Sequence, residues 1–264
     1  MNRIFLICLC FCLTATLTQA EIQTKTITYQ DGDQQLEGFL AWDDTIQDKQ
    51  PGVLVVHEWW GLNNYARHRA TQLAALGYVA FAADMYGKGQ VTTHPDEAGK
   101  WMNTIQQNIQ AWQTRAQKAL AVLQAQTLVD SQRLAAIGYC FGGATVVQLA
   151  YSGAPVKGIV SFHGSLPLPP NTQQAKTKAK IFIAHGHADP FISKAHIQNF
   201  QTALDQAGVD WQMVLYAGAR HSFTNPGADQ HGMDALRYDQ DADRRSWQHM
   251  QLFFDEIFED THKF

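Results

Sequence analysis

Residues 134–143 read Leu-Ala-Ala-Ile-Gly-Tyr-Cys-Phe-Gly-Gly, an apolar run that ends in a cysteine flanked by glycines. The first six residues predict a strand buried on both faces, and residues 142–151 predict a helix that follows almost at once. A sharp turn between the strand and the helix leaves no space for a side chain two residues before or after its apex. Glycines, Gly138 and Gly142, occupy these two positions. The pattern matches a nucleophile elbow with Cys140 at its apex. The helix N-terminus would favour a thiolate there, whereas the alternative is an inert buried cysteine.

Strands and helices alternate on both sides of this turn. The residues around Gly32 predict a turn that joins two strands into an antiparallel hairpin at a sheet edge. Strands are predicted at 22–29, 36–42, 52–57, 78–82, 134–139, 156–162, 179–184 and 211–216, and helices at 64–76, 95–126, 142–151, 193–206 and 241–259. This order predicts one α/β domain over residues 21–264, with a mostly parallel sheet and helices on both faces. The ligand site of such a sheet lies beyond the carboxyl ends of its strands.

Two further polar residues follow predicted strands at that edge of the sheet. Asp189 comes shortly after the strand at 179–184, and His221 comes shortly after the strand at 211–216. An elbow nucleophile needs a base and an acid that orients it, in the chain order nucleophile, acid, base. The order and placement therefore predict a catalytic triad of Cys140, Asp189 and His221.

The stretch 185–190, His-Gly-His-Ala-Asp-Pro, has a second interpretation as a set of metal ligands. Dinuclear zinc hydrolases carry a similar stretch, but they have another histidine where this chain has Pro190. A catalytic zinc site needs about three converging protein ligands, and the other histidines lack suitable spacing. We therefore predict a site without metal.

The strand at 52–57 leads into Glu58-Trp59-Trp60, the position of the loop that supplies the second N–H of an oxyanion hole. The predicted donors are the backbone N–H groups of Trp59 and Phe141. Glu58 places an acid at the same cavity, although a surface or helix-capping carboxylate is the alternative. The two tryptophans either line a pocket or fill the core.

Composition excludes several classes of protein. Charged residues make up 17% of the 264 residues and hydrophobic residues 45%, so a disordered chain, collagen and a coiled coil are excluded. Lys and Arg number 20 against 24 Asp and Glu. Without a broad basic field, nucleic acid is not expected as a partner.

The first 20 residues have the pattern of a secretory signal. Met1-Asn2-Arg3 precedes ten apolar residues, and Thr18-Gln19-Ala20 provides a small residue before a cut. We predict export, to the periplasm or the medium, with no stable membrane insertion after cleavage. A membrane anchor would need about 20 apolar residues, and a lipoprotein cut at an early cysteine would leave almost no signal. Three of the four cysteines lie in this segment, so Cys140 would have no disulfide partner.

Five motifs resemble those of the dienelactone hydrolase family within the α/β-hydrolase superfamily, and the resemblance covers about residues 24–259. In chain order they are HEWWGLN at 57–63, DMYGKG at 84–89, GYCFGG at 138–143, HGHADP at 185–190 and RHSF at 220–223. The resemblance implies a monomer without a cofactor that hydrolyses a small lactone or ester through a cysteine thiolate.

The resemblance also implies roles for single residues. Glu58 corresponds to the acid that contacts the resting cysteine, and Tyr86, Lys88 and Ser222 correspond to substrate contacts. Lys88 keeps the charge of the family's arginine but lacks the fork that suits a carboxylate. The alternatives to an esterase are an exported, catalytically silent scaffold that binds a ligand, and a thiol redox sensor. The sensor would lack a resolving cysteine.

Overall fold

The computed structural model describes residues 21–169 and 177–259. The predicted signal peptide, residues 1–20, lies outside the described residues. The strands are β1 Ile22–Asp31, β2 Gln34–Asp43, β3 Gln50–Val56, β4 Val79–Ala83, β5 Val129–Tyr139, β6 Gly158–Phe162, β7 Lys180–Gly186 and β8 Trp211–Tyr216. The helices are α1 Asn64–Ala75, α2 Pro95–Gln106, α3 Ile109–Gln124, α4 Phe141–Tyr151, α5 Lys194–Gln206 and α6 Gln240–Phe258, with a short 3-10 helix, η1, at Ala228–His231.

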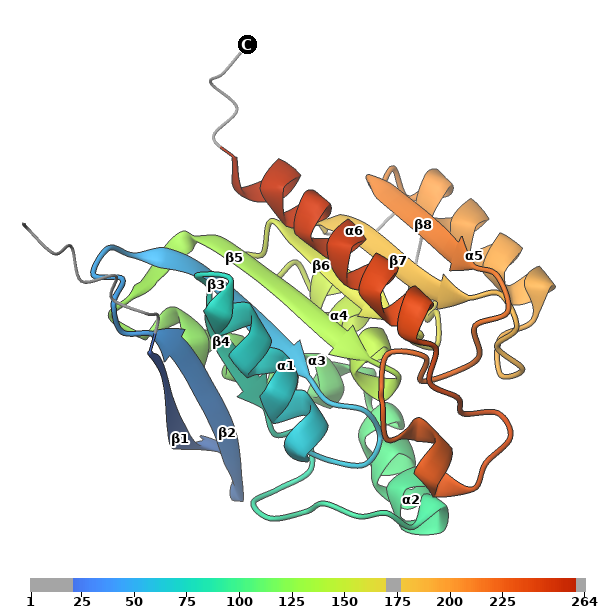
Figure 1. The fold of residues 1–264 in the computed structure, drawn as a ribbon, viewed down its shortest axis with the longest axis horizontal. Coiled ribbons are helices and arrows are strands. Elements are labelled where there is room, and N and C mark those ends of the chain that lie inside the picture. Colours follow the sequence, from blue (N-terminus) through green and yellow to red (C-terminus); the bar gives the residue numbers. More distant parts are fainter. Residues whose placement is uncertain (1–20, 170–176, 260–264) are drawn as a thin grey trace, which may run out of the picture.

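The strands of the described residues form one sheet in the order β1-β2-β4-β3-β5-β6-β7-β8. The β1–β2 and β2–β4 pairs are antiparallel, and the pairs from β4 through β8 are parallel. This confirms the predicted α/β fold, a mostly parallel sheet with an antiparallel hairpin at its edge. In Figure 1 the sheet runs across the molecule from β1 to β8.

Helices cover both faces of the sheet, as predicted (Figure 1). On one face α1 and α6 bury Leu73 and Phe254 against strand residues such as Val55 and Phe182. On the other face α3 and α4 belong to a second core, which includes Leu120. The central strands are therefore buried on both sides, and this explains their continuous apolar sequences.

The single helix predicted over residues 95–126 is wrong, because the structure divides it into α2 and α3. Asn108 leaves the helical conformation, with φ −125° and ψ 95°, and its side chain accepts a hydrogen bond of 3.0 Å from the N–H of Ala111. Asparagine satisfies a free N–H group at a helix start better than it stabilises a helix interior. The apolar spacing continues across the break and hides it in the sequence.

No helix in the described part of the chain is long and apolar enough to cross a membrane.

Candidate active site

The turn between β5 and α4 has the geometry of a nucleophile elbow. Cys140 lies at its apex with φ 53° and ψ −113°, a conformation that L-residues rarely adopt. A Cβ on Gly138 would collide with the carbonyl of Gly142, and a Cβ on Gly142 would collide with the carbonyl of Val56. The steric requirement for both glycines is thus confirmed.

Cys140 faces a histidine that a buried carboxylate orients. His221 Nδ1 lies 2.7 Å from Oδ2 of Asp189, and the other oxygen of Asp189 accepts the N–H of Phe191 at 2.9 Å. Both side chains of the pair are almost completely buried. Because the Nδ1–H group of His221 donates its hydrogen bond to Asp189, Nε2 is the ring nitrogen that is available to the thiol.

The charges around His221 favour its imidazolium form. Burial by itself lowers the pKa of His221, but the charge of Cys140 and hydrogen bonds with Asp189 and Cys140 outweigh it and raise the pKa to about 10. These contacts favour a protonated His221 beside an ionised thiol at neutral pH. An imidazolium in this place stabilises an anion on Cys140 Sγ.

Glu58 points to the loop that carries His221. Its carboxylate accepts hydrogen bonds of 2.6 Å from Ser222 Oγ and 2.6 Å from Asn225 Nδ2. Burial raises the pKa of Glu58, although these two donors oppose the rise. Among the described residues, no hydrogen bond joins Glu58 to Cys140. The carboxyl group of Glu58 instead holds the loop that carries His221.

Two backbone amides stand free beside the nucleophile. Phe141 is the first residue of α4, and Trp59 follows β3 after His57 and Glu58. Within the described residues neither N–H has a hydrogen-bond acceptor. Free donors at the start of a helix and on the facing loop are what an oxyanion requires.

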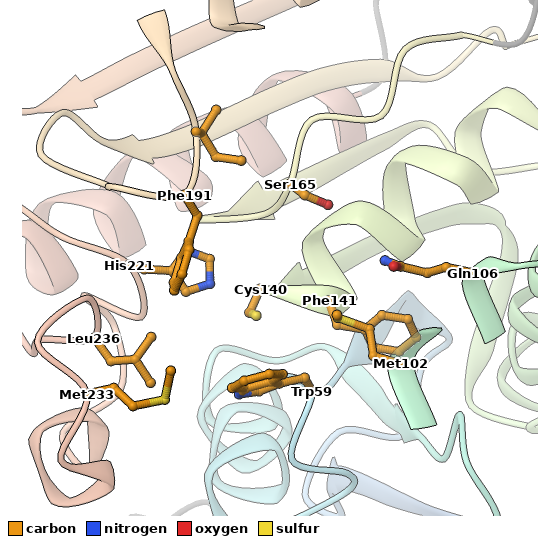
Figure 2. A pocket seen from close by; sticks show the side chains of 11 residues that line it. Trp59, Met102, Gln106, Cys140, Phe141, Ser165, Phe191, His221, Met233 and Leu236 are labelled. Carbon is orange, nitrogen blue, oxygen red and sulfur yellow. The ribbon is translucent and has the colours of Figure 1, made fainter. Parts of the chain in front are cut away.

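A cavity of about 270 Å³ opens directly above Cys140. Figure 2 shows His221, Phe191, Met233 and Leu236 on one side of the thiol and Phe141 and Met102 on the other, with Trp59 below the thiol in this view. The lining is completed by Gln106, Ser165 and Ile192. Trp59 lines the cavity, whereas Trp60 is fully buried in the core against His231.

The three side chains that the family resemblance assigns to substrate do not line this cavity. Lys88 is 54% exposed and pairs with Glu37 at 3.1 Å. Tyr86 is buried, and its ring packs 5.4 Å from that of Phe141. Ser222 is buried against Glu58, as described above.

No group of three or more His, Cys, Asp or Glu side chains in the described residues is arranged to hold a metal ion. In the HGHADP stretch Asp189 instead forms a hydrogen bond with His221, and His187 is exposed.

A family model described as the dienelactone hydrolase family matches residues 36–258. The chain belongs to this family. A Synechocystis protein provisionally named a carboxymethylenebutenolidase is 28% identical, over 89% of this chain and 97% of its own. The solved structure "m3DLH" is 41% identical, with a TM-score of 0.87 over 90% of this chain and 99% of that chain. A crystal structure of a dienelactone hydrolase-like promiscuous phosphotriesterase from metagenomic libraries is 38% identical, with a TM-score of 0.87 over 91% of this chain and all of its own.

These similarities make the protein a carboxylic ester hydrolase of the dienelactone hydrolase family. The five motifs on which the sequence resemblance rests all lie within the part of the chain that the family model matches.

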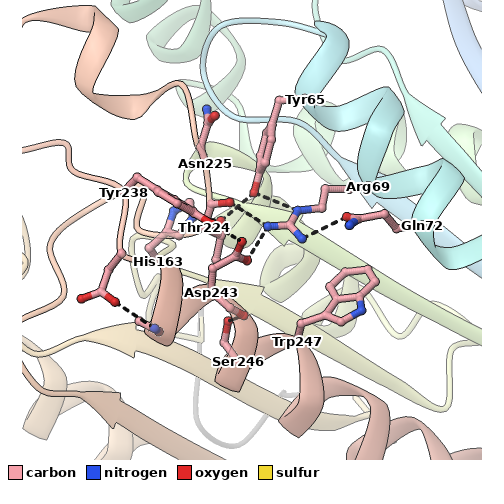
Figure 3. Close-up of polar contacts among 12 residues, drawn as sticks. Tyr65, Arg69, Gln72, His163, Thr224, Asn225, Tyr238, Asp243, Ser246 and Trp247 are labelled. Atoms are coloured by element: carbon pink, nitrogen blue, oxygen red, sulfur yellow. Dashed lines mark hydrogen bonds and ion pairs between the residues drawn. The ribbon is translucent and has the colours of Figure 1, made fainter.

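The dienelactone hydrolase fold of this chain contains a polar network behind the site that sequence reasoning missed (Figure 3). His163 follows β6 directly and is fully buried, with φ 41°. Its Nδ1 accepts the N–H of Cys140 at 3.2 Å, and its Nε2 lies 2.8 Å from Oγ1 of Thr224. His163 thereby links the nucleophile to the loop of the base. Its position at the carboxyl end of a strand was the signal in the sequence.

Arg69 anchors the other end of this network. It projects from α1, is 5% exposed, and donates to the carbonyl of Thr224 at 2.7 Å and to Asp243 Oδ1 of α6 at 2.5 Å. Its Nε also donates to Tyr65 Oη at 3.2 Å, and Tyr65 Oη lies 2.6 Å from the hydroxyl of Thr224 (Figure 3). A buried ion pair thus holds the segment that follows His221. No local sequence pattern marks Arg69, because its partners are about 155 to 174 residues away.

Arg69→Met is expected to lower the free energy of unfolding by about 3–5 kcal/mol, because it leaves the carboxylate of Asp243 buried without its partner. Denaturant unfolding followed by tryptophan fluorescence measures the loss. The double variant Arg69→Met/Asp243→Leu is the matched control and should recover a large part of it. A double variant no more stable than Arg69→Met would show that the cost does not come from the unpaired charge.

Proposed function

We propose that this hydrolase cleaves small carboxylic esters or lactones through a Cys140-His221-Asp189 triad and a thioester acyl-enzyme. The observation that carries the proposal is the hydrogen-bonded series from Asp189 through His221 to Cys140 at the apex of a strained elbow. Family membership supports the same reaction class.

In the first step Cys140 Sγ attacks the carbonyl carbon of the substrate. The N–H groups of Trp59 and Phe141 hold the oxygen that becomes negative, and removal of one such donor costs about 100- to 1,000-fold in rate. Collapse of the tetrahedral intermediate breaks the bond to the alkoxide, which takes the Nε2 proton of His221. In a lactone the alcohol remains attached to the acyl group.

In the second step His221, now neutral, accepts a proton from water while the water oxygen attacks the thioester carbonyl. The carbon–sulfur bond breaks and the carboxylic acid leaves. Sγ is again an anion beside a protonated His221, which is the charge state that the resting geometry favours. Asp189 keeps the imidazole in the same orientation throughout.

His57 has a positioning role in this mechanism. Its Nδ1 lies 2.5 Å from the carbonyl oxygen of Glu58, and its Nε2 accepts the N–H of Met85 at 3.2 Å. Burial lowers the pKa of His57, so the ring is neutral and Nδ1 donates. The carbonyl of Glu58 and the N–H of Trp59 belong to one planar trans peptide and point in opposite directions. Holding the carbonyl therefore aims the N–H at the substrate.

Contact between Glu58 and the thiol, which the family resemblance implies, is part of the proposal. It requires the carboxyl group to leave Ser222 and Asn225. The raised pKa of Glu58 supports such a movement, since a neutral carboxyl accepts these hydrogen bonds more weakly than a carboxylate. We also propose that the protein is exported, on the basis of the signal-like composition of residues 1–20.

Cys140→Ala should lower kcat for an activated ester by about 10⁴-fold or more, because the nucleophile is absent. His221→Gln should cause a comparable loss and, with wild-type Cys140, should accumulate acyl-enzyme detectable by intact-protein mass spectrometry. His187→Gln is the matched control, since this exposed histidine lies in the same HGHADP stretch. Near-wild-type turnover by Cys140→Ala would exclude the proposed nucleophile.

Alkylation by iodoacetamide separates the enzyme from a catalytically silent scaffold. Since a protonated His221 stabilises a thiolate on Cys140, the wild-type alkylation rate should rise less steeply between pH 7 and 9 than that of an ordinary thiol. In His221→Gln the rate should rise up to about tenfold per pH unit below about 8.5, as for an ordinary thiol. Esterase activity should disappear in step with labelling. Full labelling of a protein that has no esterase activity to lose would favour the scaffold, and activity retained after full labelling would exclude Cys140 as the nucleophile.

His57→Phe keeps a ring between Tyr86 and Phe141 but cannot donate to Glu58. We expect kcat to fall about 10- to 100-fold, which is less than the loss expected when an oxyanion donor is removed altogether. KM should change by less than about threefold. His57→Gln, which keeps an amide donor, should recover part of kcat. If KM rises while kcat is unchanged, His57 does not position the donor and its role is packing alone.

A further inference from the structure

The side chains that line the cavity over Cys140 are mostly apolar. Of the eleven lining residues, seven are apolar or aromatic: Trp59, Met102, Phe141, Phe191, Ile192, Met233 and Leu236. Gln106 and Ser165 are polar and uncharged, and the remaining two are Cys140 and His221. No lysine, arginine, aspartate or glutamate is among them. Figure 2 shows the apolar side chains on both sides of the thiol, where an acyl and an alcohol group would lie.

Three cationic side chains, one of them next to His221 in the sequence, are held by partners outside the cavity. Lys88 binds Glu37 at 3.1 Å, and Arg115 binds Asp31 at 2.6 Å and the carbonyl of Met85 at 2.9 Å. Arg220 precedes His221, but it donates to the carbonyl of Asp234 at 2.5 Å. None of these three residues lines the cavity.

The one cation in the cavity is already neutralised. His221 lies between Asp189 and Cys140, and it gives up its proton during the reaction. Glu58 lies behind the same loop and, as an acid, supplies no positive charge. A substrate carboxylate would therefore enter an apolar cavity with no cation to pair with, and this is strongly unfavourable.

From this lining we propose that the enzyme acts on uncharged esters or lactones with apolar acyl or alcohol groups, and that it discriminates against substrates with a second, ionised carboxyl group. The inference rests on the proposed ester hydrolysis at Cys140. Phe191 supports it, since this ring is 53% exposed and its centroid lies 5.0 Å from that of His221. An apolar substrate would cover this exposed surface and gain free energy from it.

Two p-nitrophenyl esters of matched size test the inference: the 6-methylheptanoate and the mono-ester of adipic acid. They differ in whether the far end of the acyl chain is an isopropyl group or a carboxylate. We expect kcat/KM to favour the uncharged ester by at least about 100-fold, after correction for spontaneous hydrolysis. Across linear esters that still fit the cavity, each added methylene should raise kcat/KM by about fourfold, which corresponds to 0.8 kcal/mol.

Charge variants make the test specific to the cavity. Met233→Arg should lower the preference for the uncharged ester by at least about tenfold, because it supplies a partner for the carboxylate. Met233→Gln is the control for polarity without charge and should not restore the anionic substrate. Lys88→Ala tests the contact that the family resemblance implies, and a loss of rate confined to the adipate ester would overturn the inference.

The outcomes distinguish the inference from the function on which it rests. Cys140-dependent hydrolysis of both esters with a preference for the adipate ester would overturn the uncharged-substrate inference and leave ester hydrolysis intact. If neither ester is hydrolysed faster than by Cys140→Ala, then the proposed function fails and the inference fails with it.

Discussion

The close approach of three backbone segments at the elbow is the constraint on which the rest of the site depends. Gly138, Gly142 and the carbonyl of Val56 pack so tightly that no Cβ fits on either glycine. This contact fixes Cys140 in its unusual backbone conformation and places its Sγ at the N-terminus of α4. It also brings the end of β3, and with it Trp59, next to Phe141. One steric contact thus positions both the nucleophile and the two candidate oxyanion donors.

The base is held from a different direction, by polar contacts instead of close packing. Residues 221–225 form hydrogen bonds with Asp189, Glu58, His163 and Arg69, which come from four separate parts of the chain. Long loops carry little packing of their own, so such a segment needs partners to adopt a single conformation. The buried Arg69–Asp243 pair supplies a fixed point for this segment between α1 and α6. His163 then couples it to the amide of Cys140.

The sequence was informative wherever a local rule applied. Continuous apolar runs identified the buried parallel strands, and the spacing of Gly138 and Gly142 about Cys140 identified the elbow. The break at Asn108 was missed because the capping preference of one residue competes with a helical apolar pattern that continues through it. Arg69 and the orientation of Glu58 were missed for another reason. Both depend on partners more than 150 residues away, and one sequence gives no information about such pairings.

The placement of Lys88 shows how a motif can persist while its chemistry changes. The motif at residues 84–89 supplies a cation at the position where the family resemblance implies an arginine, but the lysine side chain pairs with Glu37 on β2. A lysine ammonium is a compact, flexible point charge, so one nearby carboxylate suffices to hold it at the surface. The cavity over Cys140 is then lined by Met102, Met233, Leu236 and aromatic rings. Within the same fold and around the same elbow, the polarity of these few side chains determines which esters can reach the thiolate.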